Sequence, residues 1–217
     1  MLRLAARLGC DRGVSLSQVW LRQTGQMRES TKSAWMKFEA RQRIELRNCA
    51  FEWKAQTGPL GAVRVDDSFR DGGGRLAVKL FGLFSVAGAA KSVSLDRGEL
   101  MRYLAELAWA PDAILRNQSL RWRDLDGGQL VVSAGEGDRR AEVEITLDQE
   151  GRISQVFAAD RPRAVGDGFE PSAWRGTFGG YRWTKGRLIP MSAEVGWVGL
   201  SDCEPVWKGR VTEWSAG

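Results

Sequence analysis

The chain has 217 residues, a net charge of +5, ten tryptophans and no histidine. The absence of histidine excludes Ser-His-Asp and Cys-His catalysis, histidine-ligated zinc and imidazole pH switching. Three cysteines are too few for a four-thiolate zinc site, and we identify no catalytic residue, metal site or cofactor.

Residues 1–17 are expected to form a short helix with a basic side, or a partly ordered segment. Leu8 and Gly9 before Cys10 are typical of a lipoprotein cleavage site, but Arg3 and Arg7 interrupt the apolar run of about 7–15 residues that a signal peptide needs. No stretch approaches the roughly 18 apolar residues of a membrane span, so stable membrane insertion is not expected. We therefore predict a cytoplasmic protein, with export or membrane association as the minor alternative.

Residues 18–92 alternate between apolar and polar side chains, the period of a β-strand. The clearest run lies between Trp35 and Arg47, where the apolar residues share one face, interrupted only by Gln42. This pattern predicts a strand with one buried and one exposed face.

Three aspartates, Asp66, Asp67 and Asp71, precede the glycines at 72–74. Carboxylates at this spacing suit either a hairpin turn or a cation with oxygen ligands. Because the spacing does not match that of an EF-hand, we favour the turn.

Residues 94–111 change to a period of 3.6, which predicts the main helix. We expect Ser94 or Asp96 to cap it and Pro111 to end it. An apolar stripe of leucines would face the sheet.

Residues 119–214 return to the alternation of strands, with a Gly- and Pro-containing loop at 164–172. Short turns between closely spaced strands predict an antiparallel meander. We therefore expect one domain, residues 1–217, that is mainly β within the α+β class. It would be one curved antiparallel sheet or open half-barrel of about nine or ten strands, with the main helix covering or plugging it.

Polar helix residues and tryptophans supply the candidate binding residues. Glu99, Arg102 and Glu106 lie at helical spacing, where they suit either a polar head group or ordinary helix-stabilising ion pairs. Arg161 and Arg163 suit an anion or a surface role. The full candidate set is Glu99, Arg102, Tyr103, Glu106, Trp109, Trp53, Trp122, Arg161 and Arg163.

A broad aromatic sheet face covered by one helix favours a non-catalytic module that binds an apolar or amphipathic small molecule, such as a lipid. One alternative is a carboxylate-based enzyme using Glu99 and Glu106 with Arg102. The other is a structural or partner-binding domain. Nucleic-acid binding is not expected, because Arg121 and Arg123 point away from Trp122 on a strand. The oligomeric state is not predicted.

The helix motif running from Arg97-Gly-Glu-Leu through Arg102-Tyr-Leu, Glu106 and Trp109 to Pro111 resembles the signature of an uncharacterised bacterial family, a domain of unknown function. Flanking pieces occur in the order that the family shows, and the resemblance covers residues 15–214. It implies no established activity. The order of strands, helix and strands is loosely similar to that of the open half-barrels of lipoprotein carriers. The flanking pieces include Gln23-x-Gly25, Phe51-x-Trp53-x-Ala55, Lys79-x-x-Gly82 and Leu120-x-Trp122-x-x-x-Asp126.

Overall fold

The computed structural model of the protein describes residues 1–10, 13, 15–30, 32–80, 84–89, 91–125, 127–166, 168–199 and 202–217, without the side chains of residues 60 and 84–89. Gly82 and Asp126 of the motif pieces above lie outside these residues.

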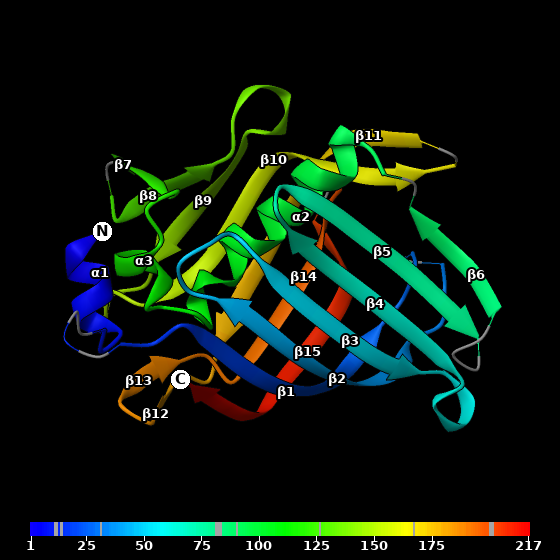
Figure 1. The fold of residues 1–217 in the computed structure, drawn as a ribbon, viewed down its shortest axis with the longest axis horizontal. Coiled ribbons are helices and arrows are strands. Elements are labelled where there is room, and N and C mark those ends of the chain that lie inside the picture. Colours follow the sequence, from blue (N-terminus) through cyan, green and yellow to red (C-terminus); the bar gives the residue numbers. More distant parts are fainter. Residues whose placement is uncertain are drawn as a thin grey trace.

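One antiparallel sheet dominates the molecule (Figure 1). It has 13 strands in the order β6-β5-β4-β3-β2-β1-β15-β14-β11-β10-β9-β8-β7, so the first and last parts of the chain meet where β1 pairs with β15. The strands of this sheet are β1 (Gln18–Met27), β2 (Met36–Glu45), β3 (Phe51–Thr57), β4 (Val63–Arg70), β5 (Gly73–Leu80), β6 (Phe84–Ala89), β7 (Arg121–Leu125), β8 (Gln129–Ala134), β9 (Ala141–Leu147), β10 (Ile153–Val165), β11 (Gly168–Gly179), β14 (Ser192–Val198) and β15 (Cys203–Ala216).

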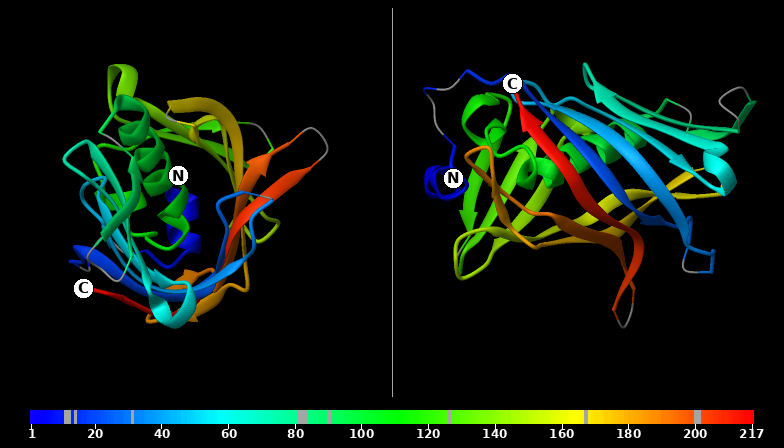
Figure 2. Two further views of the ribbon diagram at one scale, coloured as in Figure 1. Left: turned by 90° about the vertical axis from the view of Figure 1, so that its right-hand side faces the viewer. Right: turned by 90° about the horizontal axis from the view of Figure 1, so that it is seen from below.

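Helices occupy a small part of the chain, and a separate hairpin completes the fold. The main helix α2 lies inside the curve of the sheet and contacts β4, β5, β8, β9 and β10 (Figure 2). The sheet curls without pairing β6 to β7 in the described part, which confirms a β-rich fold with one curved sheet around one helix. The remaining elements are α1 (Leu2–Arg7), α2 (Val93–Ala105), α3 (Ala113–Arg116), the 3-10 turns η1 (Pro59–Gly61), η2 (Glu106–Ala108) and η3 (Gly137–Arg139), and the hairpin of β12 (Arg182–Thr184) and β13 (Arg187–Ile189).

The sheet has more strands than the nine or ten that the sequence predicts. Residues 174–197, within the region 119–214 that is predicted to form strands, form parts of β11 and β14 separated by the small hairpin of β12 and β13. The expected loop at 164–172 is also largely strand. β10 and β11 continue to Val165 and Gly168, and Pro162 lies opposite Pro171.

The main helix also begins and ends earlier than predicted. Its N-cap is Ser92, whose Oγ accepts a hydrogen bond from the Leu95 amide at 3.1 Å. Asp96, the alternative cap, instead accepts from the Gly74 amide at 2.7 Å and from Arg139 Nε at 2.9 Å. The side chain of Asp96 therefore fixes the start of α2 to β5 and to the η3 region.

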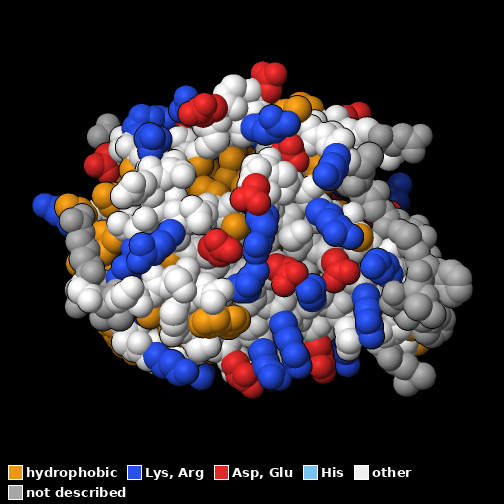
Figure 3. Space-filling model, viewed as in Figure 1, with side chains coloured by type: hydrophobic (Ala, Val, Ile, Leu, Met, Phe, Trp, Pro, Cys, Tyr) orange, Lys and Arg blue, Asp and Glu red, His pale blue; other side chains and the backbone are white. Residues whose placement is uncertain are grey.

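Alternation divides the two faces of the sheet as predicted. On β2, Phe38, Ala40 and Ile44 are buried together with Gln42. The outer face carries basic and acidic side chains interspersed with one another (Figure 3), including exposed ion pairs such as Arg22–Glu213.

Two glycines let the chain curve tightly where β1 meets β15. Gly25 lies opposite Gly209, and a Cβ at Gly25 would lie 2.0 Å from the Lys208 carbonyl oxygen. Any other residue would therefore push these strands apart. The absence of a side chain at Gly209 also leaves room for the Trp207 ring, which would lie 2.1 Å from a Cβ at Gly209.

The N-terminal helix packs into the fold. Leu4, Ala5 and Leu8 are buried, and the Leu8 carbonyl oxygen accepts a hydrogen bond from the Leu188 amide at 3.1 Å. A buried ion pair also connects β13 to the start of α3. Arg187 on β13 makes two hydrogen bonds to Asp112, the residue before α3, at 2.7 and 2.9 Å. The first eight residues thus belong to the folded domain.

Candidate functional site

A cavity of about 370 Å³ lies between α2 and the inner face of the sheet. Its volume falls in the range of roughly 300–1,000 Å³ that is usual for small-molecule sites. Strands from the N-terminal part of the chain (β1, β3, β4 and β5) and from its C-terminal part (β10, β11, β14 and β15) contribute to the wall of the cavity. Its lining residues include Trp53, Trp109, Trp174, Trp197, Trp207, Phe178, Val195, Asp67, Arg102, Glu106 and Arg161.

Aromatic rings form most of the apolar wall, and they are held in place by their neighbours. The Trp109 ring lies edge-on to Phe178, with 5.5 Å between the ring centroids, and 6.3 Å from Trp207. Its Nε1 donates to the Pro190 carbonyl oxygen at 3.0 Å. Trp53 Nε1 donates to Gln23 Oε1 at 2.9 Å. Because these indole N–H groups are already paired, the rings present apolar surface to the cavity.

Arg102 is the centre of a buried polar cluster at one side of the cavity. Its Nε donates to Glu106 Oε1 at 2.9 Å, and its Nη1 donates to Asp67 Oδ2. Its guanidinium also lies over the Trp53 ring, 5.1 Å from the centroid. Glu106 accepts a second hydrogen bond from Gln42 Nε2, so both of its oxygens are occupied.

Burial and charge shift the titration of this cluster. Burial lowers the pKa of Arg102, but the carboxylates of Glu106 and Asp67 outweigh it and hold that pKa above its ordinary value. Burial raises the pKa of Glu106, against the opposing charge of Arg102. Arg102 therefore stays charged and paired.

Glu99 and Asp67 form a carboxyl pair beside Arg102. Burial raises the pKa of Glu99 well above its ordinary value, and the adjacent Asp67 carboxylate raises it further. The two side chains share a hydrogen bond, in which the protonated Glu99 donates to Asp67. Two like charges at this spacing would repel, so one shared proton is the stable arrangement.

Two arginines of β10 lie over tryptophan rings of the neighbouring strands. Arg161 is 4.8 Å from the centroid of Trp174, and Arg163 is 5.1 Å from that of Trp197. Arg161 lines the cavity. Such cation–π contacts hold the guanidinium groups against the rings. Arg161 Nη1 has no hydrogen-bond partner among the residues that the structure describes.

The structure brings most of the predicted site residues together. Trp53, Arg102, Glu106, Trp109 and Arg161 line the cavity. Glu99 lies behind Asp67 in the same cluster.

Besides Glu99, three predicted residues lie outside the cavity lining. Arg163 lies over the ring of Trp197, which is a lining residue. Tyr103 is fully buried elsewhere, where its hydroxyl donates to the Glu45 carbonyl oxygen at 3.0 Å and accepts from Asn117 Nδ2 at 2.9 Å. Trp122 is half-buried on β7, an edge strand of the sheet. These positions give Tyr103 and Trp122 packing roles.

Asp67 is a charged residue of the cavity lining that the sequence pattern assigned to a turn. Only Asp71 lies in the expected turn, with a positive φ of 51°, whereas Asp67 lies on β4 and is 7% exposed. The alternation of side chains in the sequence does indicate this position, because Asp67 shares the inward face of its strand with Val65 and Phe69. A carboxylate in an apolar row indicates a buried partner.

In the ranges that the structure describes, no group of three or more Cys, Asp or Glu side chains is placed to hold a metal ion. No described helix is long and apolar enough to cross a membrane.

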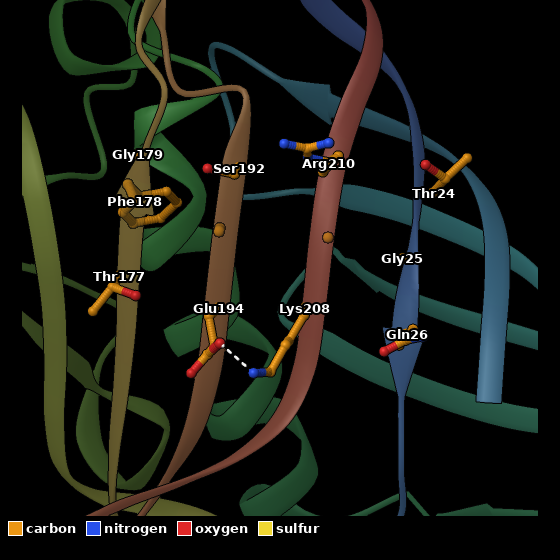
Figure 4. Close-up of a pocket in the computed structure, with 12 residues that line it drawn as sticks. Thr24, Gly25, Gln26, Thr177, Phe178, Gly179, Ser192, Glu194, Lys208 and Arg210 are labelled. Atoms are coloured by element: carbon orange, nitrogen blue, oxygen red, sulfur yellow. Dashed lines mark ion pairs between the residues drawn. The ribbon is translucent and has the colours of Figure 1, made fainter. Parts of the chain in front are cut away.

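A larger groove of about 530 Å³ lies on the outer face of β1, β11, β14 and β15 (Figure 4). Glu194 and Lys208 pair across it at 2.9 Å, and Thr24, Gln26 and Arg210 are exposed around it. Because these side chains face solvent and its central charges are paired, the inner cavity is the better candidate site.

Comparison with known proteins places the chain in a family. The sequence profile of DUF6920, a family of unknown function, matches residues 7–215. The chain belongs to the DUF6920 family. This match confirms the resemblance to an uncharacterised family. A search of curated proteins finds no match to this DUF6920 protein.

Solved structures similar to the DUF6920 protein share its open-barrel fold. A candidate outer membrane lipoprotein-sorting protein domain from Vibrio parahaemolyticus aligns with a TM-score of 0.57 and 11% identity, over 99% of this chain and 89% of that one. A LolA superfamily protein from Nitrosomonas europaea aligns with a TM-score of 0.50 and 8% identity, over 99% and 92%. A DUF1329 family protein from Desulfovibrio piger gives 0.50 and 10%, over 98% and 89%. At these identities the likeness establishes the fold alone.

Proposed function

We propose that this DUF6920 protein is a non-catalytic module that binds an apolar or amphipathic small molecule, such as a lipid, between α2 and the curved sheet. The observation that carries the proposal is the cavity of about 370 Å³ with an aromatic wall and a polar cluster at one side. Such a division suits a ligand with an apolar body and a polar end. The likeness in fold to a lipoprotein-sorting protein and a LolA superfamily protein supports it.

The geometry argues against the carboxylate-based enzyme. Both oxygens of Glu106 already accept hydrogen bonds, from Arg102 and Gln42, and Glu99 lies behind Asp67 instead of at the cavity wall. An acid–base pair needs carboxyl groups that reach a substrate proton. The structural or partner-binding alternative stays a prediction.

The cytoplasmic location also stays a prediction. Cleavage before Cys10 would remove Leu4, Ala5 and Leu8 from the core. This packing supports retention of the segment in the mature protein. Comparing the mass of the native protein in cell fractions would locate it and show whether residues 1–9 are present.

Binding of the uncharged fluorophore N-phenylnaphthylamine tests the proposed function. Val195 lines the cavity, so we expect Val195→Trp to fill it and to weaken binding at least about ten-fold. Val198, on the same strand, is 36% exposed and outside the lining, so Val198→Trp is the matched control with unchanged affinity. Circular dichroism checks that both variants fold. Saturable binding that the two variants retain equally, or no saturable binding to the native protein, would overturn the proposal.

A further inference from the structure

The outer face of β1–β5 carries an excess of positive charge. Side chains that alternate with the inward-facing residues of these five strands point outward, and Lys and Arg side chains gather over the strands in the space-filling view (Figure 3). Nine basic and four acidic residues lie on this face, and the excess equals the net charge of +5 of the whole chain. The basic residues are Arg22, Lys37, Arg41, Arg43, Lys54, Arg64, Arg70, Arg75 and Lys79, and the acidic residues are Glu39, Glu45, Glu52 and Asp66.

Basic residues of this face lie directly opposite one another on neighbouring strands. Arg41 on β2 is opposite Arg22 on β1 and also opposite Lys54 on β3. Arg64 on β4 is opposite Lys79 on β5. Because like charges in opposite positions destabilise a sheet, this arrangement lowers the stability of the fold. It therefore indicates an anionic partner from outside the chain.

Ion pairs within the chain neutralise only part of this charge. The ion pairs that include the basic residues of this face are Arg22–Glu213, Lys54–Glu52 and Arg70–Glu45. Glu39 and Asp66 form no ion pair with any residue that the structure describes. In the same described ranges, five basic residues also form none: Lys37, Arg41, Arg64, Arg75 and Lys79.

An exposed tryptophan on the same face favours one kind of anionic partner. Trp20 on β1 is 41% exposed and lies opposite Arg43. A tryptophan among basic residues is typical of a surface that rests on an anionic bilayer, because the indole ring prefers the level of the lipid head groups. Single-stranded nucleic acid instead needs several rings on which successive bases stack. Trp20 is the one aromatic residue on the outer face of β1–β5, all of whose residues the structure describes.

We propose that the outer face of β1–β5 docks on the surface of a membrane that contains anionic phospholipids. Its basic side chains bind the lipid phosphates, and Trp20 lies at the level of the head groups. The cavity lies on the other side of the sheet, between the inner face and α2. Docking through the outer face therefore leaves the cavity unobstructed and does not depend on the proposed function.

Co-flotation of the native protein with lipid vesicles tests this docking surface. At physiological ionic strength we expect binding to vesicles of phosphatidylglycerol mixed with phosphatidylcholine, and no binding to vesicles of phosphatidylcholine alone. Salt at about 1 M should release the protein, because the Debye length falls to about 3 Å. A single-stranded oligonucleotide should bind more weakly than the anionic vesicles at equal phosphate concentration. Absence of binding to the anionic vesicles, equal binding to both kinds of vesicle, binding that high salt leaves unchanged, or tighter binding to the oligonucleotide would overturn the inference.

Two double variants that remove the same net charge locate the surface. Arg41→Gln combined with Arg64→Gln changes two exposed residues of the proposed face that form no ion pair with the described residues. A basic residue near an anionic membrane surface contributes about 1 kcal/mol, or about five-fold in affinity. We therefore expect affinity for the anionic vesicles to fall about 25-fold in this variant. Circular dichroism checks that the variant folds.

Arg121→Gln combined with Arg123→Gln is the matched control. These exposed residues lie on β7, on the same face as Glu142 and Glu144 of β9, so positive and negative charges balance there. We expect a change of less than about two-fold, because charges more than about 8 Å from the bilayer are screened at physiological salt. Equal losses in the two double variants would show that overall charge and not the outer face of β1–β5 causes binding, and would overturn the inference. Such a result would leave the proposed function intact, since ligand binding in the cavity is measured separately.

Discussion

At the scale of single residues, Arg102 connects the main helix to the sheet. It pairs with Glu106 one turn along its own helix and with Asp67 on β4. Sequence spacing predicted the first pair but not the second, because nothing in the spacing on the helix shows which strand lies opposite it. Long-range partners of a buried charge depend on the packing of elements, which local patterns do not contain.

The raised pKa of Glu99 leads to a prediction about how the stability of the protein depends on pH. Since its pKa is raised in the folded protein, the folded state holds this proton more tightly than the unfolded chain does. Its contribution to stability is therefore complete below the ordinary Glu pKa of about 4.3, and it is lost as the pH rises through the raised pKa of the folded state.

The variant Glu99→Gln, which cannot ionise, isolates this effect. We expect its free energy of unfolding to rise relative to that of the native protein, by up to about 1.4 kcal/mol per pH unit, as the pH increases through that range. Urea denaturation at a series of pH values measures the difference. A difference that stays constant across the pH series would contradict the shared proton.

At the scale of elements, α1 tests whether the N-terminus belongs to the domain. Leu8, the residue that follows α1, is fully buried, whereas Leu2 at the start of α1 is 58% exposed. We expect Leu8→Ala to reduce the free energy of unfolding by about 2–5 kcal/mol, and Leu2→Ala to change it by less than about 0.5 kcal/mol. Chemical denaturation of the two variants measures both values. Equal, small effects would show that α1 is not part of the cooperative fold.

The elements also show where sequence patterns succeed and fail. Alternation identified β2 and its buried face, including Gln42, because side chains of a strand point to opposite sides in turn. The 164–172 segment was missed because Gly and Pro usually indicate loops, yet Pro162 and Pro171 lie opposite each other in a long hairpin. In this segment the pairing of β10 with β11 outweighs the preference of Gly and Pro for loops.

At the scale of the whole molecule, the fold explains why a cavity exists. A sheet of 13 strands curls around one main helix, and α2 contacts β4, β5 and β8–β10. The tryptophans of β3, β11, β14 and β15 line the space that remains beside it. Composition indicated an aromatic interior: eight of the ten tryptophans are buried or half-buried, and Trp20 and Trp183 are the exposed pair. Composition does not predict where the cavity lies, because its position depends on how α2 packs against the sheet.

Quenching of tryptophan emission by dibromostearic acid methyl ester tests the central claim, binding inside the cavity, most directly. Bromine quenches only at contact range, and five tryptophans line the cavity. We predict saturable quenching at one ester per protein that the unbrominated ester reverses by competition. Weak quenching that rises in proportion to ester concentration, without saturation or competition, would show that the tryptophan wall does not receive the ligand.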